Sequence, residues 1–460
     1  MTLTMESTSA ERIVEIREKQ RKYFHSGATL DVKARKAALK KFEQAVLKWE
    51  KPLCNALWAD LHKSYEEAYL TEISILLGEI RTHIRKIGKW TRPQRKCTPL
   101  KLFPSSSRIV SEPLGTALII SPWNYPVQLL LTPLVGAISA GCTAVLKPSP
   151  YVPTVSKVIE DMICDTFPEE YVAVTQGHRD VNGLLLEQRW DMIFFTGSPS
   201  LGRLVMASAA KNLTPVVLEL GGKSPCIIDK DADIMTAAKR VAWGKSLNAG
   251  QTCIAPDYLM LHKDIKDSFL SALKAEFNAL LGDDPQKSGH FVRIVNDKAF
   301  ERIESYLKDG DIVFGGHRDR AERYFEPTVL DNVSADSPVM QEEIFGPIFP
   351  VQTFSDIDEV TEFVSSREKP LALYYFGKQG DKVIRATSAG GTCINDTIMH
   401  IANDNVPFGG VGMSGMGSYH NKLSFDAFTH YRAVISTPTC MDLPFRYMPY
   451  SWFNVVKKLL

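Results

Sequence analysis

The segment from Pro113 to Leu146 constrains the fold most, because it contains no charged residue. Its length would suit a membrane-spanning helix, which needs about 20 consecutive apolar residues. Four prolines and polar side chains such as Asn124 interrupt the segment, so a continuous apolar span is missing. We instead predict a β-α-β unit covered on both faces, with strands at Thr116–Ile120 and Cys142–Leu146 and a helix from about Val127 to Ala140.

Helical and strand-like patterns alternate over much of the chain. A capping-box pattern at Thr8–Glu11 begins helical patterns that continue to about Trp90, and β-like runs follow near Leu102 and at Arg108–Val110. This alternation indicates an α/β fold with a mostly parallel sheet. Beyond Leu146 we predict helices at Thr154–Phe167, Leu201–Ala209, Ile234–Leu247 and Lys263–Leu281, and strands at Val172–Val174, Met192–Phe195, Val216–Leu218, Cys226–Ile228 and Tyr258–Leu261.

Charge and cysteine usage exclude several classes of protein. The 54 basic and 53 acidic side chains give a formal net charge of +1, so the chain lacks the basic surface that a nucleic-acid partner requires. The eight cysteines form no C-x-x-C pair, and no metal site or disulfide framework is expected. Because no secretory signal pattern begins the chain, we expect a cytoplasmic protein with reduced thiols.

Three glycine- or aspartate-rich segments imitate known motifs without their context. Gly410–Gly415 matches the G-x-G-x-x-G pattern, but no strand precedes it, and we interpret it as a glycine-rich turn. Gly222–Ser224 resembles the end of a P-loop, but Val217 occupies the position of the first glycine. Asp229–Asp233 has the initial spacing of a calcium loop but lacks its glycine, and we expect Asp233 to cap the next helix.

Cys253 is the candidate nucleophile. It lies in the glycine-containing turn Asn248–Pro256, where backbone N–H groups can approach a ligand closely. Structural cysteines usually sit inside apolar runs, as Cys142 and Cys226 do. The local sequence leaves two interpretations open, a reactive thiolate or an inert thiol.

Glu219 and Asn124 are the candidate partners of this thiol. Glu219 stands between leucines at the end of an apolar strand, where burial would raise its pKa towards that of a general base. The alternative is a strand-end glutamate turned to solvent. Asn124 lies on a turn between two prolines, where it is either a turn former or a donor to an oxyanion.

Seven short motifs follow one another along the chain: Ser121–Asn124, Lys147–Ser149, Phe195–Ser198, Glu219–Pro225, Gly250–Cys253, Glu342–Pro347 and Pro407–Gly410. In this order and approximate spacing they resemble the aldehyde dehydrogenase superfamily over almost the whole chain. The sequence Cys253–Tyr258 and the tail with Tyr419 and His420 look most like the class 3 branch, which includes fatty and aromatic aldehyde dehydrogenases.

The resemblance implies an α/β fold with a Rossmann-type NAD(P)-binding domain, an α/β catalytic domain and a small β element for oligomerisation. Strands of that element would contact a partner subunit, so a homodimer is expected. The tail from Trp452 to Leu460 is too short to cross a bilayer, and no transmembrane segment is expected. The expected boundaries are 1–97 and 116–218 for the NAD(P)-binding domain, 219–415 for the catalytic domain, and 98–115 with 416–460 for the bridging element and tail.

The resemblance also implies a reaction, the NAD(P)-dependent oxidation of an aldehyde to the carboxylic acid. Cys253 would attack the carbonyl, and the Asn124 amide and the Cys253 N–H would hold the oxyanion. After hydride transfer, Glu219 would activate the water that hydrolyses the thioester. Two alternatives are an acylating dehydrogenase, which Glu219 argues against, and a binding or structural protein without catalysis.

For the cofactor, NAD or NADP, the resemblance assigns Lys147 and Ser149 to the adenosine ribose and Glu343 to the nicotinamide ribose. A helix N-terminus near Ser198 would face the pyrophosphate. Lys147 could instead be a solvated strand end, and Phe345 a core aromatic. The residues expected at the cofactor are Trp123, Lys147, Ser149, Gly197, Ser198, Gly202, Gly221, Glu343 and Phe345.

Pro150 departs from the family pattern. Many members that prefer NAD carry a glutamate at this position, where it binds the adenosine 2′-hydroxyl and repels a 2′-phosphate. With Pro150 in its place, Lys147 is free to pair with a phosphate, so NADP is expected to be tolerated or preferred.

Overall fold

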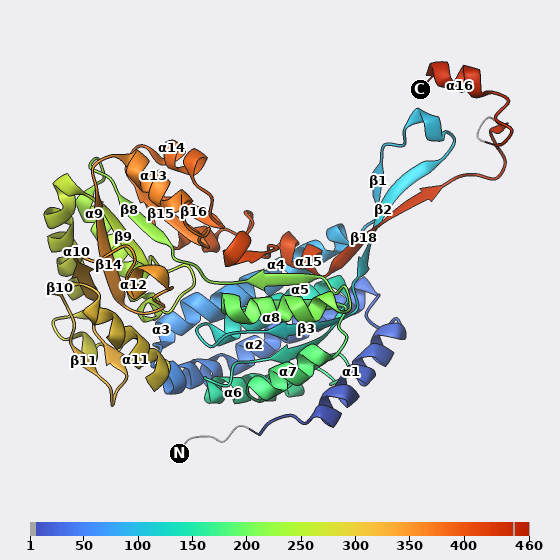
Figure 1. Cartoon of the computed structure of the whole chain (residues 1–460). Helices are drawn as coiled ribbons and strands as arrows, with labels where there is room; N and C mark the ends of the chain where they lie inside the picture. Colours follow the sequence, from blue (N-terminus) through green and yellow to red (C-terminus); the bar gives the residue numbers. More distant parts are fainter. Residues whose placement is uncertain (1–5, 445–446, 460) are drawn as a thin grey trace.

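Two large α/β bodies and a projecting β-arm make up the molecule (Figure 1). The computed structural model describes residues 6–444 and 447–459, so the parts of the predicted segments at 1–5, 445–446 and 460 lie outside the described residues. Most neighbouring strands in the two large sheets are parallel. The predicted α/β fold is confirmed.

The first sheet contains six strands. Its strands are, in spatial order, β17 (Gly415–Met416), β7 (Val216–Glu219), β6 (Met192–Thr196), β3 (Thr116–Ile120), β4 (Thr143–Lys147) and β5 (Val172–Val174). The five strand predictions in this region are confirmed to within one residue. β17 runs antiparallel to β7 and places Gly415 opposite Glu219, so a late segment of the chain completes the sheet.

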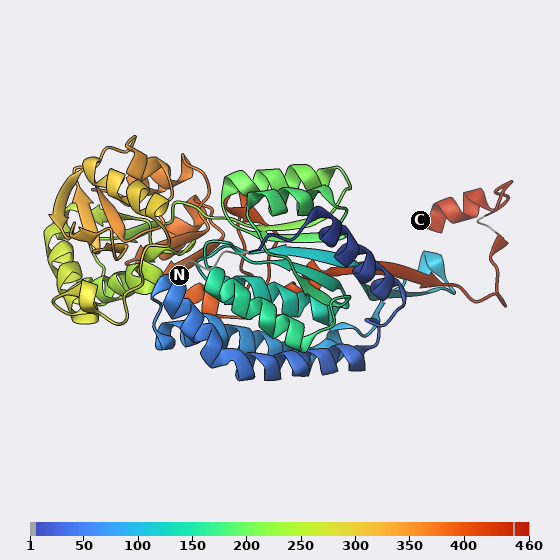
Figure 2. The ribbon, with the colours of Figure 1, turned by 90° about the horizontal axis from the view of Figure 1, so that it is seen from below.

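Alternate residues along β3 face two different helix layers. Ala117 and Ile119 pack in one apolar cluster, whereas Leu118 and Ile120 pack in another. Both faces of the strand are therefore covered, which explains why the segment carries no charge. Figure 2 shows α2 and α8 on opposite sides of this sheet. One layer contains α2 (Val32–Leu61), α4 (Ser74–Trp90), α5 (Pro126–Ala140) and α6 (Pro153–Thr166), and the other contains α1 (Ala10–His25), α7 (Arg179–Glu187) and α8 (Pro199–Ala210).

Helix boundaries follow the local sequence signals. Ser9 caps α1 by accepting a hydrogen bond from the Arg12 N–H at 3.2 Å. Helix α5 begins with Pro126, whose missing N–H costs nothing at that position, and ends at Gly141, whose φ of +98° favours glycine. The predicted β-α-β unit is confirmed as β3, α5 and β4, and the membrane alternative is wrong.

The second sheet contains seven strands between two further helix layers. Asp233 caps the helix that follows it by accepting a hydrogen bond from the Thr236 N–H at 2.9 Å. The predicted capping role of Asp233 is confirmed. The strands are, in spatial order, β10 (Asp311–Phe314), β13 (Thr328–Asp331), β14 (Ile348–Phe354), β9 (Tyr258–His262), β8 (Pro225–Ile228), β15 (Ala372–Phe376) and β16 (Gly391–Ile394). The helices are α9 (Ile234–Ser246), α10 (Lys266–Leu281), α11 (Asp297–Ser305), α13 (Ile357–Ser365) and α14 (Gly380–Ala386).

The arm is a three-stranded antiparallel sheet of β1 (Gln94–Lys96), β2 (Ser106–Pro113) and β18 (Thr429–Ser436). It projects from the body, and the short helix α16 (Phe453–Leu459) lies near its tip (Figure 1). The β-like run predicted near Leu102 is wrong. Residues Leu100–Leu102 form a 3₁₀ turn, in which the Leu102 N–H bonds to the Pro99 carbonyl, because the chain reverses direction at this tip.

Two further elements lie between the last strand of the second sheet and β18 of the arm. The segment Gly410–Gly415 forms a tight turn, with a 3₁₀ turn at Gly412–Ser414, which confirms the interpretation as a glycine-rich turn. Helix α15 (Lys422–Ala427) then packs on α5. Within residues 6–444 and 447–459, the structure contains no helix whose length and hydropathy would suit a membrane span.

Candidate active site

Cys253 follows a turn of unusual backbone geometry. The 3₁₀ turn Leu247–Gly250 comes after α9, and Asn248, Ala249 and Gly250 have φ angles of +51°, +50° and +71°. A Cβ on Gly250 would lie 2.4 Å from the Gly346 carbonyl oxygen, so only glycine fits there. Consecutive left-handed residues store backbone strain, which is typical of functional sites.

The Gln251 side chain holds this turn in place. Its Nε2 donates to the carbonyls of Asn248 and Arg293, both at 3.1 Å, and its Oε1 accepts from the Val295 N–H at 3.1 Å. Gln251 is fully buried, so these hydrogen bonds form in a low-dielectric environment. The backbone on either side of Cys253 is thereby fixed.

Cys253 differs from the other seven cysteines in exposure. All eight lie in the described part of the chain, where none forms a disulfide; four are buried, three are exposed, and Cys253 is partly exposed. Burial raises the pKa of the Cys253 thiol, and the nearby carboxyls of Glu343 and Glu219 raise it further.

Glu219 is the last residue of β7 and is only 3% exposed. Neither of its carboxyl oxygens has a hydrogen-bond partner among the described residues. Burial raises the pKa of Glu219 well above its ordinary value. The alternative in which this side chain turns to solvent is wrong, and the residue has the properties of a general base or acid.

Asn124 lies after β3, at the carboxyl edge of the first sheet. Its Nδ2 donates to the Gln251 carbonyl at 3.1 Å, which ties the Asn124 turn to the turn that carries Cys253. The neighbouring Tyr125 hydroxyl contacts the Thr252 hydroxyl at 2.7 Å. Asn124 is 2% exposed, and its amide nitrogen has a second N–H besides the one that bonds to Gln251.

Glu343 lies against the backbone that follows Glu219. A Cβ on Gly221 would be 2.0 Å from the Glu343 Oε2, so the carboxyl occupies the space that this glycine leaves. Burial and the Asp257 carboxylate raise the pKa of Glu343 to about 8. Glu343 Oε1 has no hydrogen-bond partner among the described residues, and it is available to a ligand.

Phe345 and Trp123 face each other across the site. Their ring centroids are 5.4 Å apart in an edge-to-face arrangement. Phe345 has a φ of +48°, which is rare for a non-glycine residue, and it is only partly buried. Phe345 is therefore not a fully buried core aromatic, and the strained backbone holds it towards Trp123.

Asp257 and Lys223 support the Glu343 loop, although the sequence analysis selects neither as a site residue. Asp257 Oδ2 accepts from the Ile344 N–H at 2.9 Å, and its other oxygen pairs with Lys223. Lys223 Nζ also donates to the Glu342 carbonyl at 2.9 Å. Asp257 follows Cys253 closely in sequence, which is the one signal that could have drawn attention to it.

The residues expected at the adenosine end gather at the carboxyl edge of the first sheet. Lys147 ends β4, is 1% exposed and donates to the Pro148 carbonyl at 2.8 Å. Burial lowers the pKa of Lys147 to about 8. The alternative of a solvated strand end is wrong. Ser149 follows within the same buried segment.

The N-terminus of α8 lies beside this edge. Ser198 caps the helix by accepting from the Leu201 N–H at 3.5 Å. A Cβ on Gly197 would lie 2.6 Å from the Phe195 ring, and one on Gly202 would lie 2.7 Å from a Leu220 methyl group. The helix dipole, the free N–H groups and the small residues fit a nucleotide pyrophosphate at this position.

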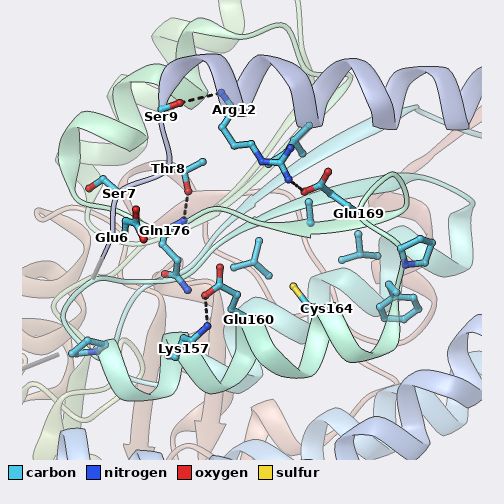
Figure 3. Close-up of a pocket in the computed structure, with 17 residues that line it drawn as sticks. Glu6, Ser7, Thr8, Ser9, Arg12, Lys157, Glu160, Cys164, Glu169 and Gln176 are labelled. Carbon is cyan, nitrogen blue, oxygen red and sulfur yellow. Dashed lines mark hydrogen bonds and ion pairs between the residues drawn. The ribbon is translucent and has the colours of Figure 1, made fainter. Parts of the chain in front are cut away.

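A cavity outside this site lies near the N-terminus of the described chain. It has a volume of about 990 Å³ and is bounded by α1, α6 and β5 (Figure 3). The Thr8 hydroxyl accepts from the Gln176 N–H at its rim, and Arg12 pairs with Glu169 across it. Neither Cys253 nor any residue expected at the cofactor lines it. Within the described ranges, no three His, Cys, Asp or Glu side chains are grouped as metal ligands would be.

Comparison with known proteins identifies the family of this chain. The model of the aldehyde dehydrogenase family matches residues 1–434. The 4,4'-diaponeurosporen-aldehyde dehydrogenase of Staphylococcus aureus is 46% identical over 93% of this chain and 94% of its own length. Human aldehyde dehydrogenase family 3 member B1 is 44% identical over 94% of this chain and 93% of its own length.

Two solved structures extend the comparison. The substrate-bound state of Staphylococcus aureus AldH superposes with a TM-score of 0.95 at 44% identity, covering 97% of this chain and 99% of that one. Indole-3-acetaldehyde dehydrogenase, in complex with NAD+, superposes with a TM-score of 0.86 at 26% identity, covering 94% and 90%.

The fold and site define an enzyme, an oxidoreductase that acts on aldehydes. The chain belongs to the aldehyde dehydrogenase family. Its relatives include family 3 aldehyde dehydrogenases, human member B1 among them, as the sequence predicts.

Proposed function

We propose that this enzyme oxidises an aldehyde to the carboxylic acid through a thioester on Cys253, with NAD or NADP as the hydride acceptor. The observation that carries the proposal is the buried Glu219 carboxyl, unpartnered within the described residues and close enough to Cys253 to raise the pKa of its thiol. Burying a carboxyl without a partner is costly, which favours a catalytic task for Glu219, and the water that hydrolyses the thioester needs a base to accept its proton.

Each residue of the site has a role in this reaction. Cys253 Sγ, once deprotonated, bonds to the carbonyl carbon, and the former carbonyl oxygen becomes an oxyanion. The Asn124 side-chain N–H and the Cys253 backbone N–H stabilise that charge. When the oxyanion returns to a carbonyl, the carbon loses its hydrogen as a hydride, which a bound NAD or NADP would accept, and a thioester remains on Cys253. Glu219 then accepts a proton from water, which attacks the thioester and releases the acid and the thiolate.

When bound, NAD or NADP would accept the hydride. We assign its adenosine ribose to Lys147 and Ser149, and its pyrophosphate to the N-terminus of α8 at Gly197, Ser198 and Gly202. Glu343 is assigned to the nicotinamide ribose. The unpartnered Glu343 Oε1 supports its assignment. Trp123, Gly221 and Phe345 complete the nicotinamide end.

NADP is proposed to be tolerated or preferred. Pro150 carries no charge, and no carboxylate at this position repels a 2′-phosphate. The Lys147 ammonium is buried within 2.8 Å of a carbonyl and has no carboxylate partner among the described residues, so it is free to pair with a phosphate. A preference for NAD of about a hundredfold or more in kcat/KM would contradict this proposal.

The domain arrangement and the assembly complete the proposal. The first sheet is assigned to cofactor binding (1–97 and 116–218), the second to catalysis (219–415), and the arm with the tail (98–115 and 416–460) to contact with a second copy. β18 supports this last assignment, because it is an edge strand with exposed side chains such as Ile435. We also propose a cytoplasmic location, in keeping with the eight free thiols.

The test is a spectrophotometric assay of NAD(P)H formation with aliphatic, aromatic and carotenoid aldehydes, the last suggested by the name of the staphylococcal relative. Activity that is lost in Cys253→Ser and that yields free acid supports the proposal. Activity that depends on coenzyme A or phosphate, with no free acid, would show an acylating enzyme instead. No NAD(P)H with any aldehyde would refute a dehydrogenase function.

A further inference from the structure

A fully buried ion pair lies beneath the Asn124 turn. Lys63 follows the end of α2, and Glu72 belongs to the π-helical segment Tyr69–Ile73 that precedes α4. Both side chains are 0% exposed, and Lys63 Nζ lies 2.7 Å from Glu72 Oε1. Removing two charges from water costs several kcal/mol for each ion, and packed apolar residues often replace such a pair without loss of stability. The pair therefore needs an explanation other than stability.

Lys63 contacts the backbone of the oxyanion candidate directly. Its Nζ donates to the Asn124 carbonyl at 3.0 Å. The same ammonium lies 4.2 Å from the centroid of the Tyr125 ring, where a cation–π contact is favourable. Lys63 thus contacts both residues at the centre of the turn, and Asn248 Nδ2 donates to the same Asn124 carbonyl at 3.1 Å.

Glu72 holds the other end of the turn. Its Oε2 accepts from the N–H groups of Val127 at 2.8 Å and Gln128 at 3.3 Å, which are free donors in the first turn of α5. Tyr125, the residue at the cap position of α5, contributes no side-chain hydrogen bond to the described helix. The carboxylate of Glu72 thus serves as the cap, supplied from a distant segment, and its negative charge faces the positive end of the helix dipole.

The π-helical segment gives Glu72 this orientation. An α-helix presents side chains at intervals of 3.6 residues, and the extra residue of a π-turn shifts the side chains that follow it. Such segments are frequent at functional sites. The helical hairpin of α2 and α4 is thereby connected to the active site, although none of its residues faces the thiol.

We propose that Lys63 and Glu72 are positioning residues that hold the Asn124 amide at the oxyanion site. The proposal rests on the proposed function, because it assumes that Asn124 donates to the oxyanion. Lys63 holds the Asn124 carbonyl, Glu72 holds the start of α5, and the turn between them has no freedom to rotate the amide away. A displacement of about 1 Å in such a group costs on the order of 10² in rate.

The test combines three single variants with one double variant. Lys63→Met keeps the length of the side chain and removes its charge, Glu72→Gln keeps the shape and weakens the cap, and Asn124→Ala removes the oxyanion donor. We expect kcat to fall roughly 10²-fold in Lys63→Met and about 10²–10³-fold in Asn124→Ala, with the dissociation constant of the cofactor unchanged within about twofold. In Asn124→Ala, adding Lys63→Met is expected to lower kcat by less than about threefold further.

Glu43→Gln is the matched control, because it removes a Glu–Arg81 pair in which the Arg81 side chain is 51% exposed. It is expected to keep the wild-type kcat. Independent, multiplicative losses in the double variant, or a wild-type kcat in Lys63→Met and Glu72→Gln, would overturn the proposal. If Lys63→Met does not fold, the double variant Glu72→Gln/Asn124→Ala is compared with Asn124→Ala. A further loss in kcat of less than about threefold supports the proposal, and a multiplicative loss overturns it.

Failure of the proposed function gives a different pattern. In that case Asn124→Ala keeps the wild-type kcat, and the positioning role is overturned together with the oxyanion role. Failure of the positioning role alone leaves Asn124→Ala impaired and Lys63→Met active.

Discussion

Replacing Gly221 by alanine tests how the Glu343 carboxyl is placed. The new Cβ would lie 2.0 Å from Glu343 Oε2 and 2.6 Å from its carboxyl carbon. Gly221 has no left-handed φ, so the backbone itself accepts alanine. The contact must instead be relieved by movement of the carboxyl, by about 1 Å or more to reach ordinary van der Waals separation.

The cost of that movement follows from the hydrogen bonds it breaks. If Glu343 binds the nicotinamide ribose, a shift of this size removes at least one hydrogen bond and leaves a buried polar group unpaired, which costs roughly 1–3 kcal/mol. Each 1.4 kcal/mol corresponds to a factor of about ten. The dissociation constant of the cofactor is therefore expected to rise about 5- to 150-fold.

Fluorescence titration with NAD and with NADP, without aldehyde, measures this change directly. Gly183→Ala is the matched control, since nothing lies within 4 Å of its Cβ position in α7. The control is expected to bind the cofactor normally and to be stabilised by about 0.5–1 kcal/mol. A folded Gly221→Ala variant that binds both cofactors as tightly as the wild type would refute the assignment of Glu343.

Three further predictions concern thioester hydrolysis, the oxyanion donor and the recognition of NADP. Glu219→Gln is expected to release about one equivalent of NAD(P)H per site in a rapid burst and then to turn over at least 10²-fold more slowly than the wild type. Stopped-flow absorbance without a burst would contradict this prediction. Asn124→Ala is expected to lose about 10²–10³ in kcat while binding the cofactor normally, as steady-state kinetics and titration together will show. Lys147 loses its charge as the pH rises through its pKa of about 8. Above that pH, kcat/KM for NADP should therefore fall more steeply than kcat/KM for NAD. Lys147→Met should remove this difference in pH dependence between the two cofactors.

The sequence predicted the parts of the fold whose causes are local. β3, α5 and β4 were predictable because burial on both faces excludes charge, and because proline and glycine mark the ends of α5. The turn at Leu100–Leu102 was not, because its apolar residues imitate a strand while the chain reverses direction.

The residues of the candidate site also differ in how far the sequence alone predicts them. Cys253 and Glu219 stand out in sequence because an unusual residue interrupts a regular pattern. Lys63 and Glu72 do not, since their roles arise from contacts with Asn124 and α5 that no sequence spacing encodes. The contact of Gly221 with Glu343 likewise exists only after the two sheets are brought together.

The pairing of β17 with β7 has a consequence for biosynthesis. Until Gly415 and Met416 leave the ribosome, the strand that ends at Glu219 has an unpaired edge, because β6 covers only its other side. At about 5–20 residues per second, the nascent chain keeps this edge open for roughly 10–40 s. An open strand edge is a template for aggregation, so the growing chain should need chaperone protection over that interval. Stalled chains that end before Gly415 should therefore be cut by protease at β7 more readily than chains that end after β17.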